Sequence, residues 1–350
     1  MKGGYFVPEH QPAGILVTGG AGFIGSHMVR HLLRSFDDTP VVNLDLLTYA
    51  GDLDRLSDLS GDHRLETIVG DVARREVVDS VLSGGEIDTV LHLAAESHVD
   101  RSITGPADFI RTNVLGTFTL LEACRDAWLE RGLGPEEVRF VHVSTDEVYG
   151  QLGPDDPPFT EDTPYAPNSP YSASKAASDH LVRAYHHTYG LPAVITNCSN
   201  NYGPHQHDEK FIPTVIRSCI AQKPIPIYGD GGNVRDWLHV EDHCRAIECV
   251  LRRGRNGVTY AIGGGHERAN LEIARTICEV MDDLRPRGAP HDRLITFVAD
   301  RPGHDWRYAI DASRMHDELG WSPAQTFESG IRRTVEWYVD RAGDNYGPQR

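Results

Sequence analysis

Residues 15–25, which read ILVTGGAGFIG, decide the fold that we expect for this chain. The apolar residues 15–17 predict a short buried strand, and the helix that follows opens on glycines at 19, 22 and 25. The overlapping pattern G-x-G-x-x-G is also met at 20, 22 and 25. Glycines at this spacing permit a tight turn and let a pyrophosphate approach the positive end of the helix. A single match is weak, because any tight strand-to-helix turn can give it, so the context decides.

The context is an alternation of short apolar strands and helices. We expect strands at 15–17, 41–45, 65–70, 89–93, 140–144, 193–197 and 259–262, and helices at 24–36, 76–82, 107–129, 172–189, 240–251 and 270–284. Buried strands that alternate with helices are typical of a parallel sheet covered on both faces. The sequence therefore predicts an α/β protein built on a Rossmann-type, doubly wound parallel sheet.

The regular spacing stops after Asn200, where a stretch rich in Pro and Gly runs to Gly232. This change predicts a second, smaller α/β lobe that binds the substrate. We expect residues 1–13 to be a leader and 14–200 to form the cofactor-binding domain, to which the chain returns at about 234–263. The substrate lobe then comprises residues 201–233 and 264–350.

Composition excludes several classes of protein. The 350 residues carry 34 Lys+Arg against 51 Asp+Glu, and this net charge of −17 argues against a nucleic-acid partner, whose phosphates attract cations. No run approaches the roughly 18 apolar residues of a membrane span, so we expect no membrane partner. Six scattered cysteines and the lack of an apolar signal segment at the start predict reduced, mostly buried thiols in a cytoplasmic protein.

A carboxylate at the end of the second strand identifies the expected cofactor. Asp45 lies 20 residues after Gly25, where its side chain accepts the hydroxyls of an adenosine ribose and repels a 2′-phosphate. The sequence therefore predicts NAD rather than NADP in a NAD-binding domain. Asp71 and Val72 follow the third strand and are placed to hold the adenine, with a simple strand-ending turn as the alternative.

Tyr171 and Lys175 stand one helical turn apart on one face of the helix predicted at 172–189. A lysine beside a tyrosine favours the phenolate and lowers the phenol pKa, as does the positive charge of a nicotinamide. The alternative is an ordinary surface pair. The chain has only four lysines against 30 arginines, which favours a specific role for Lys175. Ser144, at the end of the preceding strand, is placed to hydrogen-bond the substrate oxygen that Tyr171 deprotonates.

These motifs together resemble the extended short-chain dehydrogenase/reductase superfamily over about residues 15–338. After Ser144 the chain reads Thr145-Asp146-Glu147, which resembles the dTDP-glucose 4,6-dehydratase family. Two adjacent carboxyl groups offer a proton donor and a proton acceptor, whereas a solvated acidic turn is the alternative. The resemblance implies oxidation at carbon 4 by Tyr171, proton removal from carbon 5 by Glu147, protonation of the leaving hydroxyl by Asp146 and hydride return to carbon 6.

Two other enzymes stay open on the sequence alone. Some UDP-glucose 4,6-dehydratases share the Thr-Asp-Glu triplet, so the base of the nucleotide is open. Nucleotide-sugar 4-epimerases hold small or non-acidic residues at the positions of Asp146 and Glu147, which makes this activity the weaker alternative. The corresponding helices of the superfamily form a dimer seam, so we expect a homodimer through helices at about 107–129 and 172–189.

The resemblance also implies a full set of contacts. For the cofactor these are Gly19, Gly22, Phe23, Ile24, Gly25, Asp45, Thr48, Asp71, Val72, Leu93, Ala94, Ala95, Thr112, Tyr171 and Lys175. For the nucleotide sugar they are Ser97, Thr145, Asn200, Lys210, Phe211, Pro226, Tyr228, Arg235, Asn270, Arg301 and His304. Helix capping is an equal alternative for Asn270, and a local ion pair is one for Asp100 and Arg101. We expect no metal, and interpret His205 and His207 as surface histidines.

Overall fold

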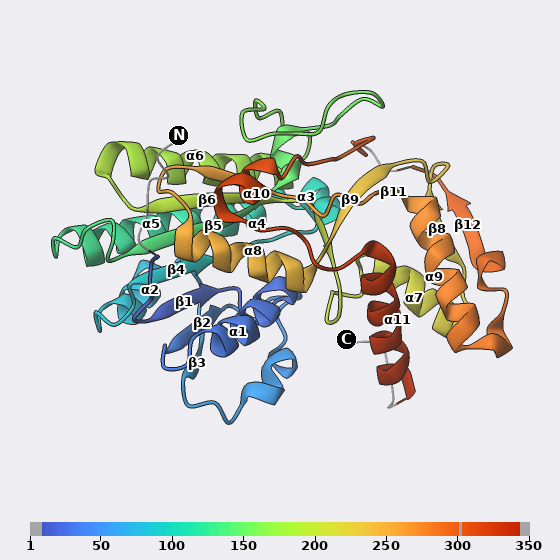
Figure 1. The fold of residues 1–350 in the computed structure, drawn as a ribbon, viewed down its shortest axis with the longest axis horizontal. Helices are drawn as coiled ribbons and strands as arrows, with labels where there is room; N and C mark the ends of the chain where they lie inside the picture. Colours follow the sequence, from blue (N-terminus) through green and yellow to red (C-terminus); the bar gives the residue numbers. More distant parts are fainter. Residues whose placement is uncertain (1–8, 301–302, 344–350) are drawn as a thin grey trace.

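The central element is a parallel sheet of seven strands (Figure 1). The computed structural model describes residues 9–300 and 303–343. The sheet order is β10-β6-β5-β4-β1-β2-β3, and every neighbouring pair is parallel. The strands are β1 (Ile15–Thr18), β2 (Val41–Asp45), β3 (Leu65–Val69), β4 (Thr89–His92), β5 (Arg139–Thr145), β6 (Ala193–Cys198) and β10 (Thr259–Ile262). The predicted doubly wound α/β fold is confirmed.

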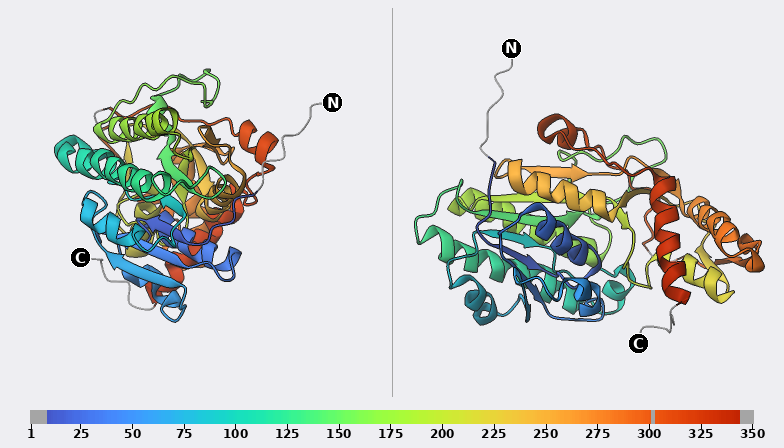
Figure 2. Two further views of the ribbon diagram at one scale, coloured as in Figure 1. Left: turned by 90° about the vertical axis from the view of Figure 1, so that its left-hand side faces the viewer. Right: turned by 60° about the horizontal axis from the view of Figure 1, so that its bottom comes forward.

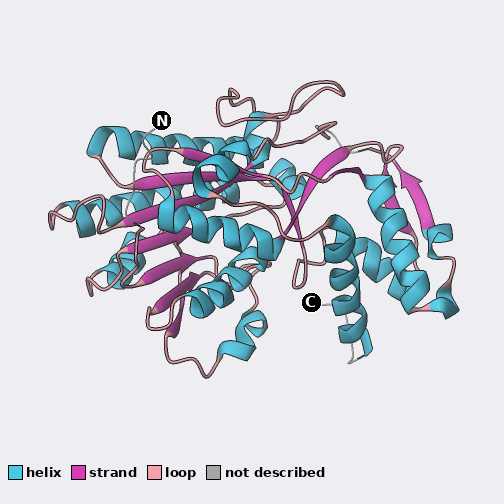
Figure 3. Ribbon diagram, viewed as in Figure 1, coloured by secondary structure: helices cyan, strands magenta, loops and turns pink. Residues whose placement is uncertain are grey.

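Helices cover both faces of this sheet, as Figures 2 and 3 show. One layer contains α1 (Phe23–Ser35), α8 (Val240–Arg253) and α10 (Ser313–Leu319); the other contains α2 (Arg75–Leu82), α5 (Thr117–Cys124) and α6 (Pro170–Tyr189). Successive strand side chains point to opposite faces, so Ile15 and Val17 pack into the first layer's core and Leu16 into the second. This two-sided burial explains why the strands are apolar throughout.

Local signals set the limits of α6, the helix that carries Tyr171. Ser169 accepts a hydrogen bond from the backbone N–H of Ser172, and the Ser172 hydroxyl accepts one from the backbone of Ser169 in return. Pro170 occupies the first turn, where its missing N–H costs nothing. The helix ends at Gly190, which adopts a left-handed conformation (φ 73°). These signals hold the start of α6 in place beside β5.

The single helix predicted at 107–129 is wrong in detail. The structure has α3 (Val99–Thr104), α4 (Pro106–Phe109), a π-helical segment Ile110–Gly116, α5, and a second π-helical segment Arg125–Leu129. The carbonyl of Asn113 accepts hydrogen bonds from the hydroxyls of Thr117 (2.5 Å) and Ser178 (2.6 Å). Side chains therefore compete with the backbone for this carbonyl, which accounts for wider turns at this point.

The remaining elements form a smaller region at one end of the sheet (Figure 1). It contains a sheet in the order β11-β9-β7 and a sheet β12-β8, with helices packed on them around a core of their own. Their bounds are β7 (Asn200–Tyr202), α7 (Phe211–Ala221), β8 (Ile225–Tyr228), β9 (Val234–His239), β11 (Glu267–Ala269), α9 (Asn270–Leu284), β12 (Ile295–Val298) and α11 (Phe327–Gly343). Short 3₁₀ turns occur at Leu53–Leu59, Asp146–Tyr149, Pro286–Gly288 and His291–Leu294.

The strand order places a crevice at the carboxyl end of the sheet. The chain runs outward in one direction from β1 through β2 to β3, and in the other from β4 through β5 to β6. Ligands of open α/β sheets bind where this direction reverses, here beyond β1 and β4. Of the six cysteines five are buried and Cys249 is half-buried, as predicted. Within the described ranges, no helix is both long and apolar enough to cross a membrane.

Candidate active site

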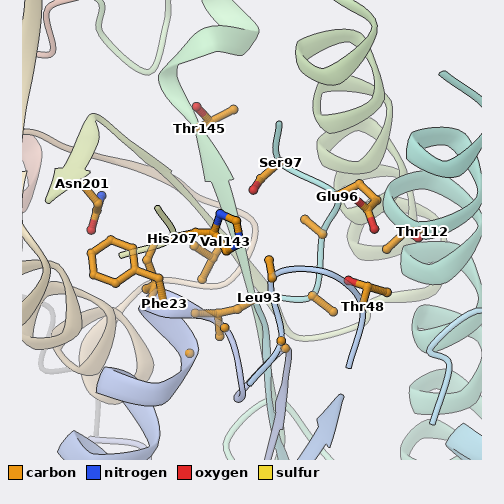
Figure 4. A pocket seen from close by; sticks show the side chains of 18 of the residues that line it. Phe23, Thr48, Leu93, Glu96, Ser97, Thr112, Val143, Thr145, Asn201 and His207 are labelled. Atoms are coloured by element: carbon orange, nitrogen blue, oxygen red, sulfur yellow. The ribbon is translucent and has the colours of Figure 1, made fainter. Parts of the chain in front are cut away.

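A cavity of about 310 Å³ opens at the carboxyl ends of the central strands. Figure 4 shows it between Phe23 and Asn201 on one side and Glu96 and Thr112 on the other. All residues predicted to contact the cofactor line it: Gly19, Gly22, Phe23, Ile24, Gly25, Asp45, Thr48, Asp71, Val72, Leu93, Ala94, Ala95, Thr112, Tyr171 and Lys175. Six separate segments of sequence therefore meet at one hollow, as the strand order requires.

The glycine turn between β1 and α1 leaves room for a ligand close to the backbone. A Cβ atom on Gly25 would lie 2.0 Å from the carbonyl oxygen of Gly19, and Gly19 itself has a φ of 76°. A side chain is therefore excluded at position 25 by the steric clash and disfavoured at position 19 by the backbone conformation. The first turn of α1 has no acidic residue and no side-chain cap, so its N–H groups face the cavity with a partial positive charge. A pyrophosphate fits this turn.

Asp45 ends β2 with its carboxylate fixed by the backbone. Its Oδ2 accepts a hydrogen bond from the N–H of Ala21 (2.9 Å) and its Oδ1 one from the N–H of Leu47 (2.8 Å). The carboxylate lines the cavity and is only 8% exposed. Such an oriented negative charge suits two ribose hydroxyls and disfavours a ribose phosphate.

Asp71 forms the far wall, in the position predicted for adenine. Burial raises the pKa of this carboxyl, but hydrogen bonds from the Arg111 guanidinium (2.6 Å) and the Ala73 N–H (2.9 Å) lower it more, so the net pKa lies below its usual value. Asp71 is therefore ionised and held in place. The fixed carboxylate and the adjacent Val72 offer one polar and one apolar contact to a planar base.

Tyr171 and Lys175 are both buried on the face of α6 that meets the cavity. Lys175 donates from Nζ to the backbone carbonyl of Val143 (2.9 Å). The pKa of Tyr171 is raised, first by burial and then by the negative charge of Glu147, while a hydrogen bond with Thr145 opposes the shift. The protein's own groups thus do not produce the lowered phenol pKa that we expected from Lys175. The lysine is bonded to the strand rather than to the phenol.

The four residues after Val143 take two different environments. Ser144, Thr145 and Glu147 line the cavity, whereas Asp146 lies behind its wall and is 2% exposed. The chain leaves β5 in a 3₁₀ turn that begins at Asp146, and the hydroxyl of Thr145 accepts the Glu147 N–H (3.3 Å). The buried Ser144 hydroxyl has no hydrogen-bond partner among the described residues, which fits a ligand oxygen as its partner.

Burial gives Asp146 the character of an acid. Its pKa is raised well above the usual value, first by burial and then by the negative charges of Glu147 and Asp236, with Arg235 acting in the opposite direction. Thr145 donates to its Oδ1 (3.3 Å), and its Oδ2 has no hydrogen-bond partner within residues 9–300 and 303–343. Burial therefore favours the protonated form of this carboxyl group, which is the form that is able to donate a proton.

The substrate side of the cavity contains Ser97, Thr145, Asn200 and Lys210, four of the predicted contacts. Lys210 donates from Nζ to the carbonyl of Ser97 (2.9 Å), which joins the loop before α3 to the loop before α7. The buried Oδ1 of Asn200 has no hydrogen-bond partner in the part of the chain that the structure describes. These residues line the cavity with groups that can form hydrogen bonds to a ligand.

Glu209 also lines the substrate side of the cavity, at the centre of a cluster of charged and ionisable side chains. No role was predicted for this cluster from the sequence. Glu209 Oε2 lies 3.3 Å from His98 Nε2 and 3.5 Å from Arg101 Nη2, and Oε1 lies 3.6 Å from His207 Nδ1. The Arg101 guanidinium also stacks 3.6 Å from the ring centre of Tyr49. Three loops far apart in sequence meet here. In the sequence, the signal that could have indicated this cluster is the position of Glu209 directly before Lys210.

The other predicted substrate residues are not on the wall of this cavity. They lie in the smaller region: Phe211, Pro226, Tyr228, Arg235, Asn270 and His304. Tyr228 and His304 are in ring contact, with centroids 6.1 Å apart. Asn270 begins α9, but the residue before it is Ala269 and no side chain caps the helix, so the capping alternative is wrong. Arg301 lies outside the described residues.

Arg235 is buried on β9. Its guanidinium donates to the carbonyls of Val234 (2.7 Å), Asp305 (2.8 Å) and Trp306 (3.2 Å), and stacks 4.4 Å from the ring centre of Tyr308. These bonds fix a positive charge near Asp146, whose pKa it lowers. Its predicted contact with a diphosphate stays a prediction.

The interpretation of His205 and His207 as surface residues is wrong. His205 packs between His27 and Trp337, with ring centroids 5.8 and 4.6 Å apart, and burial lowers its pKa to about 3. His207 lines the cavity beside Tyr49. Sequence spacing did not reveal this burial because the contacts come from distant segments.

Comparison with known proteins agrees with these observations. The family model described as GDP-mannose 4,6 dehydratase matches residues 16–334. The dTDP-glucose 4,6-dehydratase of Xanthomonas campestris pv. campestris (strain B100) is 58% identical over 327 residues, 93% of this chain and 92% of that protein. That of Salmonella typhimurium (strain LT2) is 55% identical over 334 residues, again 93% and 92%.

Solved structures agree as well. The dTDP-glucose 4,6-dehydratase DesIV from Streptomyces venezuelae, crystallised with NAD bound, superimposes with a TM-score of 0.86 at 48% identity, covering 94% of this chain and 98% of that one. Sequence identity above one half and shared architecture thus extend over nearly the whole chain. The chain belongs to the dTDP-glucose 4,6-dehydratase family.

Proposed function

We propose that this protein is an NAD-dependent dehydratase that converts dTDP-glucose to dTDP-4-keto-6-deoxyglucose. The observation that carries the proposal is the pair Asp146 and Glu147 at the end of β5. One carboxyl is sealed from solvent with a raised pKa, and its neighbour lines the same cavity as Tyr171. A dehydration needs one group that donates a proton and another that accepts one, and this pair supplies both.

The cofactor site fits NAD. The glycine turn holds the pyrophosphate at the start of α1, Asp45 holds the adenosine ribose, and Asp71 with Val72 holds the adenine. NAD held by these residues would supply the hydride acceptor for carbon 4 of the sugar and the hydride donor for carbon 6. Family members crystallised with NAD support this assignment.

Tyr171 takes the proton of the carbon-4 hydroxyl, and the unpaired hydroxyl of Ser144 donates to the same oxygen. Burial opposes ionisation of this phenol, so the positive charge of Lys175 and that of the bound cofactor must favour the phenolate. Glu147 then removes the proton on carbon 5, which is protonated again when the hydride reaches carbon 6. Asp146, protonated because it is buried, gives its proton to the hydroxyl leaving carbon 6.

The nucleotide sugar extends from this centre into the smaller region. We assign Ser97, Asn200, Lys210 and Thr145 to the sugar side of the cavity, where they lie. We assign the remaining predicted contacts to the nucleotide: Phe211, Pro226, Tyr228, Arg235, Asn270, Arg301 and His304. We propose residues 14–200, with the return of the chain at about 234–263, as the NAD-binding domain, and 201–233 with 264–350 as the nucleotide-sugar-binding lobe. Two elements depart from this division, because β9 pairs with β7 and β11 of the smaller region and α10 packs against α8 and β10 of the larger one.

We further propose a cytoplasmic homodimer with neither a nucleic-acid nor a membrane partner. Apolar side chains are exposed on the predicted dimer helices: Ile110 (54%), Leu115 (47%), Phe118 (41%) and, on α6, Tyr189 (48%). Two copies that pack these helices together would bury this surface. Sedimentation as a monomer at micromolar concentration would contradict the dimer.

The alternatives are less well supported. UDP-glucose dehydratase shares the triplet, but relatives at 55% and 58% identity act, by name, on dTDP-glucose. A 4-epimerase reacts at carbon 4 alone and has no use for the Asp146 and Glu147 pair.

The test is incubation of the purified protein with dTDP-glucose and, separately, with UDP-glucose, followed by the alkali-induced absorbance of a 4-keto sugar. We expect product from dTDP-glucose. Glu147→Gln should reduce turnover by about 10²–10⁴-fold while carbon-4 oxidation continues, visible as reduced nicotinamide at 340 nm. No product from either substrate would overturn the proposal.

A further inference from the structure

Helix α6 carries a buried carboxylate, Asp179, for which the mechanism above has no role. Asp179 stands four residues after Lys175 and eight after Tyr171, so the three share one face of the helix. Asp179 is 0% exposed and Lys175 is 4% exposed. A carboxylate and an ammonium sealed from water on consecutive turns call for a physical explanation, because each is costly to bury alone.

The surroundings of Asp179 favour its ionised form. Its Oδ2 accepts hydrogen bonds from the Tyr165 hydroxyl (2.7 Å) and from Asn197 Nδ2 (3.2 Å), and its Oδ1 lies 3.2 Å from His142 Nε2. Burial raises the pKa of Asp179, but the contact with His142, the charge of Lys175 and the Tyr165 hydrogen bond lower it more, so the net pKa lies below the usual value. Asp179 is therefore a buried negative charge.

The groups packed around Lys175 come from three strands. His92 (β4) and His142 (β5) are fully buried, and burial lowers the pKa of both, that of His142 to about 4, so both are neutral at pH 7. Burial keeps the Cys198 thiol (β6) protonated by raising its pKa. Burial lowers the pKa of Lys175 itself, and the charge of Asp179 is the foremost influence that raises it.

Asp179 also reaches the catalytic turn. Asn197 Nδ2 donates to Asp179 Oδ2 and, at 3.1 Å, to the backbone carbonyl of Thr145. Thr145 is the last residue before the two reacting carboxyls. Asp179 thus interacts with Lys175 through its charge, and the amide of Asn197 links it by hydrogen bonds to the backbone next to Asp146.

We infer that Asp179 is a positioning residue that keeps Lys175 protonated inside the protein and, through Asn197, fixes the backbone at Thr145. A neutral amine in place of the ammonium would leave the Tyr171 phenolate without a nearby positive charge. The catalytic part of this role of Asp179 rests on the dehydratase activity proposed above. Its effect on the charge of Lys175 does not depend on that activity.

The scarcity of lysine makes that charge measurable. The NMR spectrum of the protein labelled with ¹³Cε-lysine contains signals from four lysines: Lys2, Lys175, Lys210 and Lys223. The single variants Lys2→Arg, Lys210→Arg and Lys223→Arg each remove one signal, so the signal that remains in all three belongs to Lys175. In the wild-type protein we expect Lys175 to be charged at pH 7. In Asp179→Asn its titration midpoint should fall by about one pH unit or more, and Asp179→Glu should restore it.

Kinetics separate this role from a merely structural one. The alkaline limb of the kcat profile with dTDP-glucose should move to lower pH by the same shift in Asp179→Asn, whereas general damage lowers kcat at every pH without moving the limb. Tyr165→Phe is the matched control, because it removes one hydrogen bond to Asp179 but keeps the charge, and it should leave the limb in place.

Three results would overturn the inference. These are an unshifted Lys175 midpoint in folded Asp179→Asn, an unshifted alkaline limb in that variant, and a wild-type Lys175 that is neutral at pH 7. The last result decides the matter even if the variant fails to fold. If dTDP-glucose gives no product at all, the NMR titration still reads the charge of Lys175, so failure of the proposed activity is distinguishable.

Discussion

Asp146→Asn provides the sharpest test of the acid assigned to the elimination. Asparagine has the size of aspartic acid and no charge, so it matches the protonated carboxyl that burial imposes at this site. We therefore expect the variant to fold and to retain its cofactor. Turnover of dTDP-glucose should nevertheless fall by about 10²–10⁴-fold, the usual contribution of a positioned general acid. At about 1.36 kcal/mol per decade this is a barrier increase of about 3–5 kcal/mol.

The same variant makes a prediction about stability that does not depend on the reaction. The pKa of Asp146 is higher in the folded state than in the unfolded state. Its contribution to stability is therefore complete at low pH and is lost as the pH rises through the window between the unfolded-state and the folded-state pKa. Across that window the wild-type protein loses about 1.36 kcal/mol of unfolding free energy per pH unit to this group. Asp146→Asn has no such loss.

Urea unfolding of both proteins at a series of pH values measures the difference. The free energies of unfolding of the two proteins should be nearly equal in acid. As the pH rises from about 4, the ordinary pKa range of an aspartate, the variant should become more stable than the wild type. A variant less stable than the wild type at neutral pH would show that Asp146 is ionised and paired. Near-normal turnover would show that another group donates the proton.

Three further predictions concern the cofactor turn and the catalytic helix. Gly25→Ala places a Cβ 2.0 Å from the Gly19 carbonyl oxygen, so the turn must shift, and the purified variant should lose most of its bound nicotinamide, measured after denaturation. Asp45→Ala should narrow the preference for NAD over NADP, since the carboxylate that repels a 2′-phosphate is gone, and affinity for each cofactor by calorimetry checks this. Ser169→Ala removes the cap of α6 and should lower the unfolding free energy by about 1 kcal/mol with unchanged cofactor content.

Local chemistry explains why much of the fold was predictable. The limits of β2 (41–45) and α9 (270–284) agree with the sequence prediction to the residue, because strand burial and helix periodicity act over a few positions. The glycine turn was predictable for the same reason. Gly25 is required by contact with Gly19, only six residues away.

The missed features depend on contacts between distant residues. The π-helical turns at 110–116 arise because Ser178, from another helix, competes for the carbonyl of Asn113. The environment of Glu209 is assembled from His98 and Arg101, more than a hundred residues earlier in the chain. No periodicity or motif spacing carries this information, since it exists only once the loops are packed together.

The different environments of Asp146 and Glu147 follow from the turn that joins them. A 3₁₀ helix rotates successive side chains by about a third of a turn, so two neighbours can face different surroundings without leaving the same site. Had β5 continued, its side chains would alternate between the two faces of the sheet, and one carboxyl would point into a helix layer. The turn instead directs Asp146 toward Asp236 and Arg235 and leaves Glu147 on the cavity wall. Sequence adjacency therefore gives proximity, and the change from strand to turn gives the difference in environment on which the proposed roles of acid and base depend.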